Sequence, residues 1–341
     1  MTVAALPGNV RLRAFQLGKE TTFGTAVPAT RRFGWTYAPT VDPHWTFPTS
    51  DTGTLDNALP PYRMATDVTG TITGPLAFND APYLWAALAK GGVTPTGGGT
   101  AKTWAYAPAS TSQDIFEIFT GEWGDDTTDQ FQYADGVLDS LTLTYPQDLG
   151  PITVDGTAYR FASVAYPVAR TGGLQVDPAP TWAYAADTSY YFNDTAGAID
   201  TTQLTNSVHD VTLVVNNNLD VKRFQNGSNS RFQAAGYGRG ARQFTVTYNF
   251  AKSTAAIAEV AKWLNANPQE RFASIRTDSV AAAQAGINYS QHILFSGFWF
   301  TRMESTYGTA NTGVQLVCQG WLDQTLTYPF SVSVVNTLTA L

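Results

Sequence analysis

The chain has 341 residues, of which 43% are hydrophobic and 14% charged, and its net charge is −7. The charged share lies well below the ~25% usual for soluble globular proteins. The acidic balance argues against a protein that grips nucleic-acid phosphates with Lys and Arg. The one cysteine, Cys318, excludes a disulfide framework within the chain.

Aromatic residues make up 13% of the chain, and together with many threonines they favour pleated, half-buried surfaces. The composition therefore predicts a mainly β fold with short helices. No run of about 18 apolar residues is present to span a membrane. The segment before Arg11 and Arg13 lacks the apolar stretch of a secretory signal, so we expect assembly in a cytoplasm.

Two segments of the chain combine an alternating strand with a short amphipathic helix. The strand pattern at 67–78 leads into 80–90, which contains Trp85, and the pattern at 242–250 leads into 253–264, which contains Trp263. Asp80 and either Ser253 or Thr254 are residue types that cap helix N-termini, so we predict that one helix begins after Asp80 and another after Ser253 or Thr254. Gly91 and the pair Asn267-Pro268 are expected to end them.

The same order of elements recurs around these two helices, which indicates an internal duplication. We predict two tandem β-sandwich (half-barrel) domains, each flanked by one α-helix. The first domain covers 1–165 and contains an insertion at 91–112, a connector covers 166–184, the second domain covers 185–325, and a C-terminal arm covers 326–341.

Two long loops lie between consecutive strands, at 45–66 and 221–242, and loops of this length are usually functional or disordered. The second loop is basic, whereas the stretch 47–67 has three Asp residues against one Arg. These loops are either solvated arms or arms that contact partner subunits through opposite charge. The candidate contact residues are Asp51, Asp56, Arg63, Lys222, Arg223, Arg231 and Arg239.

The sequence offers little support for catalysis, and we predict no catalytic, cofactor or metal site and no enzyme. His44, His209 and His292 lack a second ligand at a metal-binding spacing, and no Gly-x-Ser-x-Gly elbow is present. Cys318 lies in a strand pattern typical of a buried, inert thiol.

An acidic segment, 122–129, is the strongest exception. Its carboxylates could form a calcium loop or, through Asp125, Asp126 or Asp129, the acid/base pair of a glycoside-active enzyme. The segment lacks the fixed ligand spacing of an EF-hand, so we favour a solvated loop.

Residues 17–30, Leu-Gly-Lys-Glu-Thr-Thr-Phe-Gly-Thr-Ala-Val-Pro-Ala-Thr, resemble the opening of siphophage tail tube (major tail) proteins, which often begin with a Gly-x-Glu-x-x-Phe/Tyr-Gly-Thr turn. The helix followed by a strand of the type found at 136–143 is also similar to that family. The resemblance implies tail-tube-type β-sandwiches whose sheets join into a β-barrel lining a channel. It also implies rings that stack through long loops, and it carries no active site.

A duplicated subunit of this kind is expected to close a pseudo-sixfold ring from three chains. The resemblance implies a structural protein of the virion tail, assembled in the host cytoplasm, whose channel passes DNA without binding it specifically. Its expected partners are other copies of the chain and tail proteins such as the tape measure and terminator, with no membrane and no cofactor. The candidate contact residues then become inter-ring contacts.

Two further expectations complete this interpretation. The segment 326–335 alternates apolar and polar residues, so we predict that it, or the N-terminal strand, pairs with a neighbouring chain. The alternative functions are another virion structural protein, such as a decoration or baseplate protein, and a duplicated β-sandwich carbohydrate-binding module that uses exposed Trp and Tyr.

Overall fold

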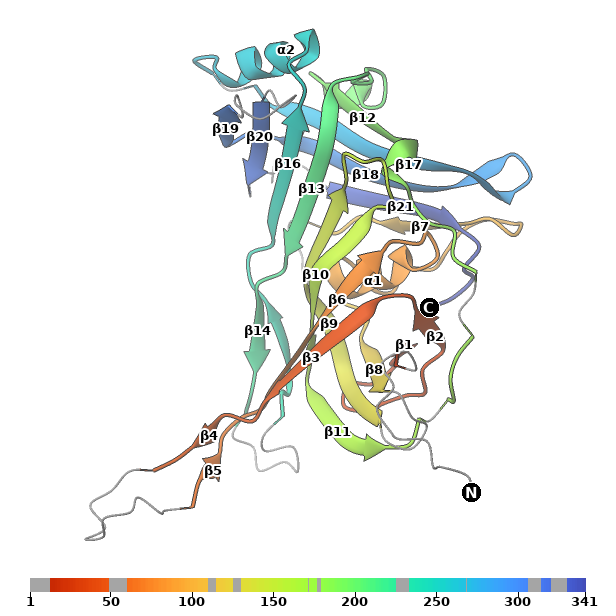
Figure 1. Ribbon diagram of the computed structural model, residues 1–341, viewed down its shortest axis with the longest axis vertical. Helices are drawn as coiled ribbons and strands as arrows, with labels where there is room; N and C mark the ends of the chain where they lie inside the picture. Colours follow the sequence, from red (N-terminus) through yellow and green to blue (C-terminus); the bar gives the residue numbers. More distant parts are fainter. Residues whose placement is uncertain are drawn as a thin grey trace, which may run out of the picture.

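The computed structural model describes residues 13–48, 60–109, 115–124, 130–170, 172–176, 179–224, 233–267, 269–305, 314–319 and 330–341. Its described residues are mainly in antiparallel β-strands, with two α-helices and two short 3₁₀ turns, Ala185–Asp187 and Ala196–Ala198 (Figure 1). The prediction of a mainly β fold with short helices is confirmed.

One large sheet runs through the molecule, and along its main path four neighbouring strands come from each half of the chain. Its strands, in spatial order, are β19 (Arg302–Ser305), β20 (Val314–Gln319), β16 (Gln243–Phe250), β13 (Val208–Asn216), β9 (Gln130–Tyr145), β10 (Thr153–Phe161), β6 (Asp67–Pro75) and β3 (Thr36–Asp42). The two halves meet where β13 pairs antiparallel with the C-terminal part of β9.

Further strands continue from this sheet or face it. The N-terminal part of β9 pairs with β8 (Phe119–Gly124) and β11 (Ser163–Val168), and β8 pairs with β1 (Ala14–Lys19), which also pairs with β2 (Arg31–Phe33). A separate five-stranded sheet has the order β12 (Thr188–Asn193), β17 (Arg271–Gln284), β18 (Ile287–Phe298), β21 (Phe330–Asn336) and β7 (Lys102–Tyr106).

The two predicted helices are present, as α1 (Ala81–Leu88) and α2 (Thr254–Trp263). Of the two candidates, Ser253 caps α2, because its hydroxyl accepts a hydrogen bond from the Ala256 backbone N–H at 3.1 Å. Asp80 holds the N-cap position of α1 as predicted, but its side chain makes no capping hydrogen bond. Its carboxylate accepts instead from the Arg31 guanidinium, with an Nε–Oδ1 distance of 2.9 Å.

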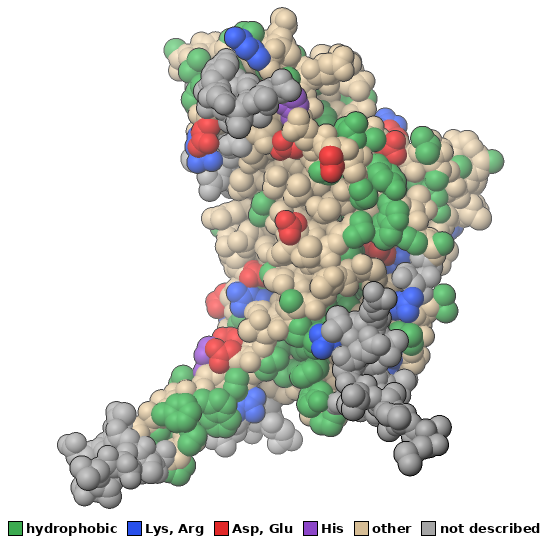
Figure 2. Space-filling view, viewed as in Figure 1, with side chains coloured by type: hydrophobic (Ala, Val, Ile, Leu, Met, Phe, Trp, Pro, Cys, Tyr) green, Lys and Arg blue, Asp and Glu red, His purple; other side chains and the backbone are tan. Residues whose placement is uncertain are grey.

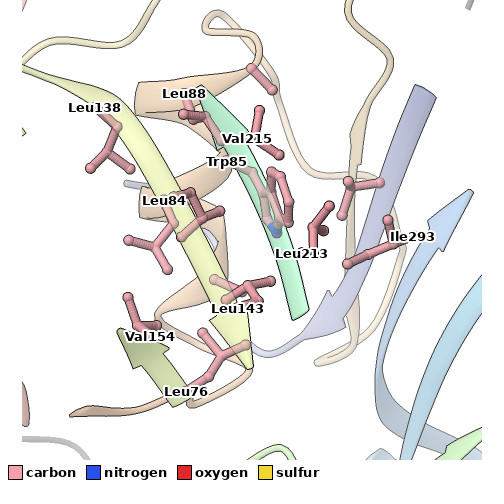
Figure 3. Packing of buried hydrophobic residues seen from close by; sticks show 14 of the residues in the cluster. Leu76, Leu84, Trp85, Leu88, Leu138, Leu143, Val154, Leu213, Val215 and Ile293 are labelled. Atoms are coloured by element: carbon pink, nitrogen blue, oxygen red, sulfur yellow. The ribbon is translucent and has the colours of Figure 1, made fainter. Parts of the chain in front are cut away.

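Helix α1 is the centre of a hydrophobic core that both halves of the chain share. Every residue of α1 is buried, and Trp85 is 1% exposed. Figure 3 shows its side chains among those of β9, β13 and β18. The labelled residues around the helix are Leu138, Leu143, Leu213, Val215 and Ile293. The helix of the first half therefore packs on the junction between the halves.

The C-terminal strand β21 (Phe330–Asn336) is paired on both sides within its own chain. Strand β21 lies between β18 and β7 of its own chain, with Phe295 opposite Phe330 and Tyr106 opposite Val332. The predicted pairing of this segment with a neighbouring chain is therefore wrong for residues 332–335, since an alternating pattern identifies a strand but not its partner. Residues 1–12 and 326–329 lie outside the described residues. The segment 91–112, predicted to be an insertion, contains the partner strand β7.

Candidate assembly surface

Two β-hairpins extend one end of the large sheet (Figure 1). Hairpin arm 1 (residues 43–66) joins β3 to β6 and contains β4 (Trp45–Thr46) and β5 (Tyr62–Arg63). Hairpin arm 2 (residues 217–242) joins β13 to β16 and contains β14 (Leu219–Lys222) and β15 (Gly236–Arg239). They are the two long loops that the sequence singled out.

Both arms begin at a backbone turn of the same geometry, which we call the corner of the arm. His44 and Asn218 have positive φ values of 45° and 46°. Each donates its backbone N–H to a side-chain oxygen two residues earlier, Asp42 Oδ1 and Asn216 Oδ1, at 2.8 Å in both cases. Short side chains that accept such bonds stabilise tight turns, and this explains the matching geometry at the two places.

Hairpin arm 1 exposes large apolar side chains. Trp45 is 53% exposed, Phe47 71%, Tyr62 54% and Met64 47%. Figure 2 shows apolar side chains gathered along this arm at the lower left. Exposed apolar patches mark contacts with other molecules, and aromatic residues are enriched at protein interfaces. The charge pattern of the sequence does not identify these residues. The aromatic residues between 45 and 64 are a second signal in the sequence, and the prediction missed it.

The bases of the two arms are tied together at Asp67. Its carboxylate accepts a hydrogen bond from His44 Nε2 at 2.7 Å and pairs with the guanidinium of Arg223. Arg223 also donates to the carbonyl oxygen of Thr66 at 3.3 Å. Burial raises the pKa of Asp67, but the bonds from His44 and Arg223 outweigh it and lower the pKa below its ordinary value. The same bond to Asp67 raises the pKa of His44.

Arg239 anchors the base of hairpin arm 2 on the first helix. Its guanidinium donates to the carbonyl oxygens of Leu88 and Ala89, at 3.4 and 3.2 Å, and lies 4.1 Å from the centre of the Phe116 ring. Helix C-termini carry partial negative charge and unsatisfied carbonyls, which favour a cation there. A basic residue of the second half thus binds an element of the first half.

The other predicted contact residues have varied surroundings. Arg63 donates to Thr66 Oγ1, with an Nε–Oγ1 distance of 3.2 Å, and Lys222 pairs with Asp220 on the exposed strand β14. Asp51, Asp56 and Arg231 lie outside the described residues. The structure thus brings Arg223 and Arg239 to the bases of the arms, in contact with their own chain. Whether the set also forms inter-ring contacts stays a prediction.

The Gly-Lys-Glu-Thr-Thr-Phe-Gly-Thr turn packs beside hairpin arm 2. The Phe23 ring meets the Tyr237 ring edge-on, with centres 6.2 Å apart. Glu20 is buried, and its Oε1 accepts from Thr120 Oγ1 at 2.6 Å and from the Asp135 backbone N–H at 2.9 Å. Burial raises the pKa of Glu20 to about 7, and the neighbouring Asp135 carboxylate adds to the rise. The turn therefore has a structural role.

The described residues contain no group of three or more side chains suited to bind a metal ion. His209 lies 3.4 Å from Gln147 Nε2, and His292 lies 3.3 Å from Asp200 Oδ2. Asp125, Asp126 and Asp129 lie outside the described residues, as does the side chain of Cys318. Among the helices that the structure describes, none is long and apolar enough to cross a membrane.

The large sheet ends in two strands at its opposite edges, β3 and β19, each paired on one side in the described part of the chain. Such edges present backbone N–H and C=O groups that can pair with another chain. The two arms and the two opposite sheet edges are therefore the parts of the described structure best suited to contact other copies of the chain.

No curated protein matches the chain. The family model described as phage tail tube protein matches residues 11–332, nearly the whole chain. This match confirms the resemblance that the turn at 17–30 indicated. The chain therefore belongs to the phage tail tube protein family and is a structural component of the virion tail.

Proposed function

We propose that three copies of this chain close a pseudo-sixfold ring around a channel for DNA, and that such rings stack through the hairpin arms to form the tube. Membership of the family establishes the role as a tail tube subunit. The number of chains, the lining of the channel and the stacking contacts are the proposal.

The proposal rests on two structural repeats in each chain, a division that the strand order supports. In the large sheet, the order β3-β6-β10-β9 in the first half matches β13-β16-β20-β19 in the second half. In the flanking strands, β1-β8-β9-β11 matches β12-β17-β18-β21. The helices α1 and α2 follow β6 and β16 in the same way.

The observation that carries the proposal is how these repeats join. Strand β13, which matches β3, pairs with the part of β9 that matches β19. The first matching strand of one repeat thus meets the last of the other, which is a head-to-tail contact. Head-to-tail contacts close into a ring when the rotation between units divides a full turn, and closure also removes exposed sheet edges.

The face of the large sheet that points away from the core is suited to a channel for DNA. The strands β3, β6, β9, β13 and β16 contain no Lys or Arg, and Arg160 of β10 is paired with Asp139 at an Nε–Oδ2 distance of 2.7 Å. A row of threonines crosses this face in register, formed by Thr153, Thr144, Thr212 and Thr247. A wall with few cations holds phosphates weakly, and its acidic residues repel them.

Negative-stain images of the purified protein test the proposal. We expect rings or tubes whose end-on class averages have a central bore and a six-lobed outline. Averages without a bore, or a protein that stays monomeric at every concentration, contradict it.

A further inference from the structure

We propose that neighbouring chains join by pairing β3 of one chain with β19 of the next, in the register that β13 and β9 adopt within the chain. This inference rests on the proposed function, and the partner is a second copy of this chain. It predicts which residues face each other across the interface, which the proposed ring alone does not.

The matching corners of the arms align β3 with β13. His44 corresponds to Asn218, and the acceptor Asp42 corresponds to Asn216. The first arm strands begin one residue after each corner, at Trp45 and Leu219. Counting back from the corner, Val41 corresponds to Val215 and Thr40 to Val214.

The strand pairings then align β19 with β9. Counting further back, Ala38 corresponds to Thr212, and these residues pair with Thr71 of β6 and Thr247 of β16. Thr71 pairs with Ala158, which pairs with Ser140 of β9. Thr247 pairs with Val317, which pairs with Arg302 of β19. Arg302 therefore corresponds to Ser140, and Met303 to Leu141.

Given these correspondences, the register of β13 on β9 predicts the register of β3 on β19 of the next chain. Within the chain, Asn216 faces Ser140 and Val215 faces Leu141. Between chains, the corresponding pairs are Asp42 with Arg302, Val41 with Met303 and Thr40 with Glu304.

Charge complementarity supports this register. Asp42 and Arg302 carry opposite charges, and their side chains are 55% and 61% exposed. Opposite charges on directly facing residues stabilise antiparallel strand pairs. Within the chain, Asp42 pairs with His44 Nδ1 at 3.2 Å and Arg302 with Glu304 Oε1 at 3.3 Å, and each of these partners is two residues away in the sequence. A one-residue slip would place Asp42 opposite a different side chain and lose the pair.

Burial supports the same register on the other face of the strands. Val215 is 1% exposed and Leu141 is fully buried, whereas Val41 is 39% exposed at the sheet edge. Met303 packs partly against the core. Pairing β3 with β19 covers Val41 with Met303, as Leu141 covers Val215.

The correspondence between the two arms also predicts that an arginine of one chain contacts helix α2 of the neighbouring chain. Arg63 pairs with Trp45 as Arg239 pairs with Leu219, so the two arginines correspond. Arg239 binds the C-terminal carbonyls of α1. Arg63 is therefore expected at the C-terminal end of α2 in the next chain, where Leu264 is 64% exposed.

Disulfide cross-linking tests the register. In a Cys318→Ala background, Val41→Cys with Met303→Cys places two thiols on facing residues, whose Cα atoms lie about 4.5–5.5 Å apart in antiparallel pairs and so within the range of a disulfide. We expect oxidised rings to run as covalent dimers and trimers on non-reducing gels. The matched control, Thr40→Cys with Met303→Cys, points its thiols to opposite faces and is expected to give at least ten-fold less product.

Neutralising the two charges provides a second test that does not depend on thiol chemistry. Asp42→Asn keeps the corner acceptor, as Asn216 shows, and is expected to reduce the ring fraction several-fold in sedimentation velocity. Arg302→Gln is expected to do the same, and because either change alone removes the pair, combining Asp42→Asn with Arg302→Gln is expected to cause no further loss. The exposed pair Arg276 and Asp278 on β17 supplies the control, because neutralising these charges is expected to leave the ring fraction unchanged.

The outcomes separate this inference from the proposed function. Rings that form normally but cross-link equally or better through Thr40→Cys contradict the register and leave the ring intact. A double variant that loses rings by the combined amount of the two single variants also contradicts the register. Wild-type protein without rings contradicts the proposed function and this interface together.

Discussion

Asp67 connects the two hairpin arms through His44 and Arg223, and this small group gives a pH-dependent property. The pKa of His44 is raised above its ordinary 6.5 by the hydrogen bond to Asp67. A group whose pKa is raised by folding stabilises the folded state fully below its unfolded pKa and loses that contribution as the pH rises through the folded pKa. The tie between the arms is therefore strongest in mildly acidic solution.

An NMR titration checks this prediction. We expect His44 to titrate above 6.5 in the wild-type protein and to return toward 6.5 in Asp67→Asn, because the amide removes the negative charge. An unchanged His44 titration in Asp67→Asn contradicts the assigned cause.

Glu20 gives a second prediction at the level of single residues. Its pKa rises from 4.5 to about 7 because the side chain is buried beside Asp135. The stabilisation by its proton is therefore full below pH 4.5 and is lost as the pH rises through about 7. At 1.36 kcal/mol per pKa unit, the free energy of unfolding is expected to fall by up to about 3 kcal/mol across this window.

Glu20→Gln removes this titration while keeping an oxygen for Thr120 and Asp135. We expect the variant to be more stable than wild type at pH 8 and to show a flatter dependence between pH 4.5 and 8. Urea denaturation of the monomer at several pH values measures both. A variant that retains the wild-type pH dependence shows that Glu20 is not the responsible group.

At the level of elements, helix α1 holds the two halves of the chain together. Trp85 is 1% exposed, and its indole Nε1 donates to Gln291 Oε1 of β18 at 3.4 Å. Replacing a buried Trp by Ala typically costs about 3–5 kcal/mol. We expect Trp85→Ala to lower the free energy of unfolding by this amount, measured by urea denaturation. Ile257→Ala on the exposed face of α2 is the control and should change stability by less than about 0.5 kcal/mol.

Hairpin arm 1 carries the prediction about stacking. Its exposed aromatic side chains lie on or next to β4 and β5, which extend beyond the end of the large sheet (Figure 1), so they are expected to act between rings. We expect Phe47→Ser with Tyr62→Ser to shorten tubes several-fold in electron micrographs while rings still form. Val280→Ser, which removes an 89% exposed apolar residue on β17, is the control. Tubes of normal length in the arm variant contradict a stacking role.

Patterns in the sequence predicted the elements better than they predicted their partners. The amphipathic helices and the capping residue Ser253 were recognisable because such signals are local. Asp80 has the same local signal, but Arg31, far away in the sequence, binds its carboxylate. The strand at 330–336 was also recognisable, whereas its pairing with β7 depends on a segment more than 200 residues earlier and is not encoded in alternation.

The candidate contact residues show the same limit. The basic character of 221–242 marked hairpin arm 2, but nothing local indicated that Arg223 would reach Asp67 or that Arg239 would reach α1. The aromatic residues of hairpin arm 1 gave a signal in the sequence that an argument from charge alone overlooked. The turn at 17–30 identified the family because its residues are adjacent in the chain.

At the level of the whole molecule, one strand contact is proposed to occur both within a chain and between chains. The contact of β13 with β9 inside the chain is proposed to recur, with the same register, between β3 and β19 of neighbouring chains. Three chains then supply six repeats, and the large sheets form a continuous wall with no free edge. Every strand of this closed wall comes from copies of the same chain.

The mass of a single ring tests this claim most directly. Native mass spectrometry of rings released from tubes is expected to give three times the chain mass of 36.8 kDa. A ring mass of six chains would contradict the proposal, because six chains supply twelve repeats rather than the six of a pseudo-sixfold ring.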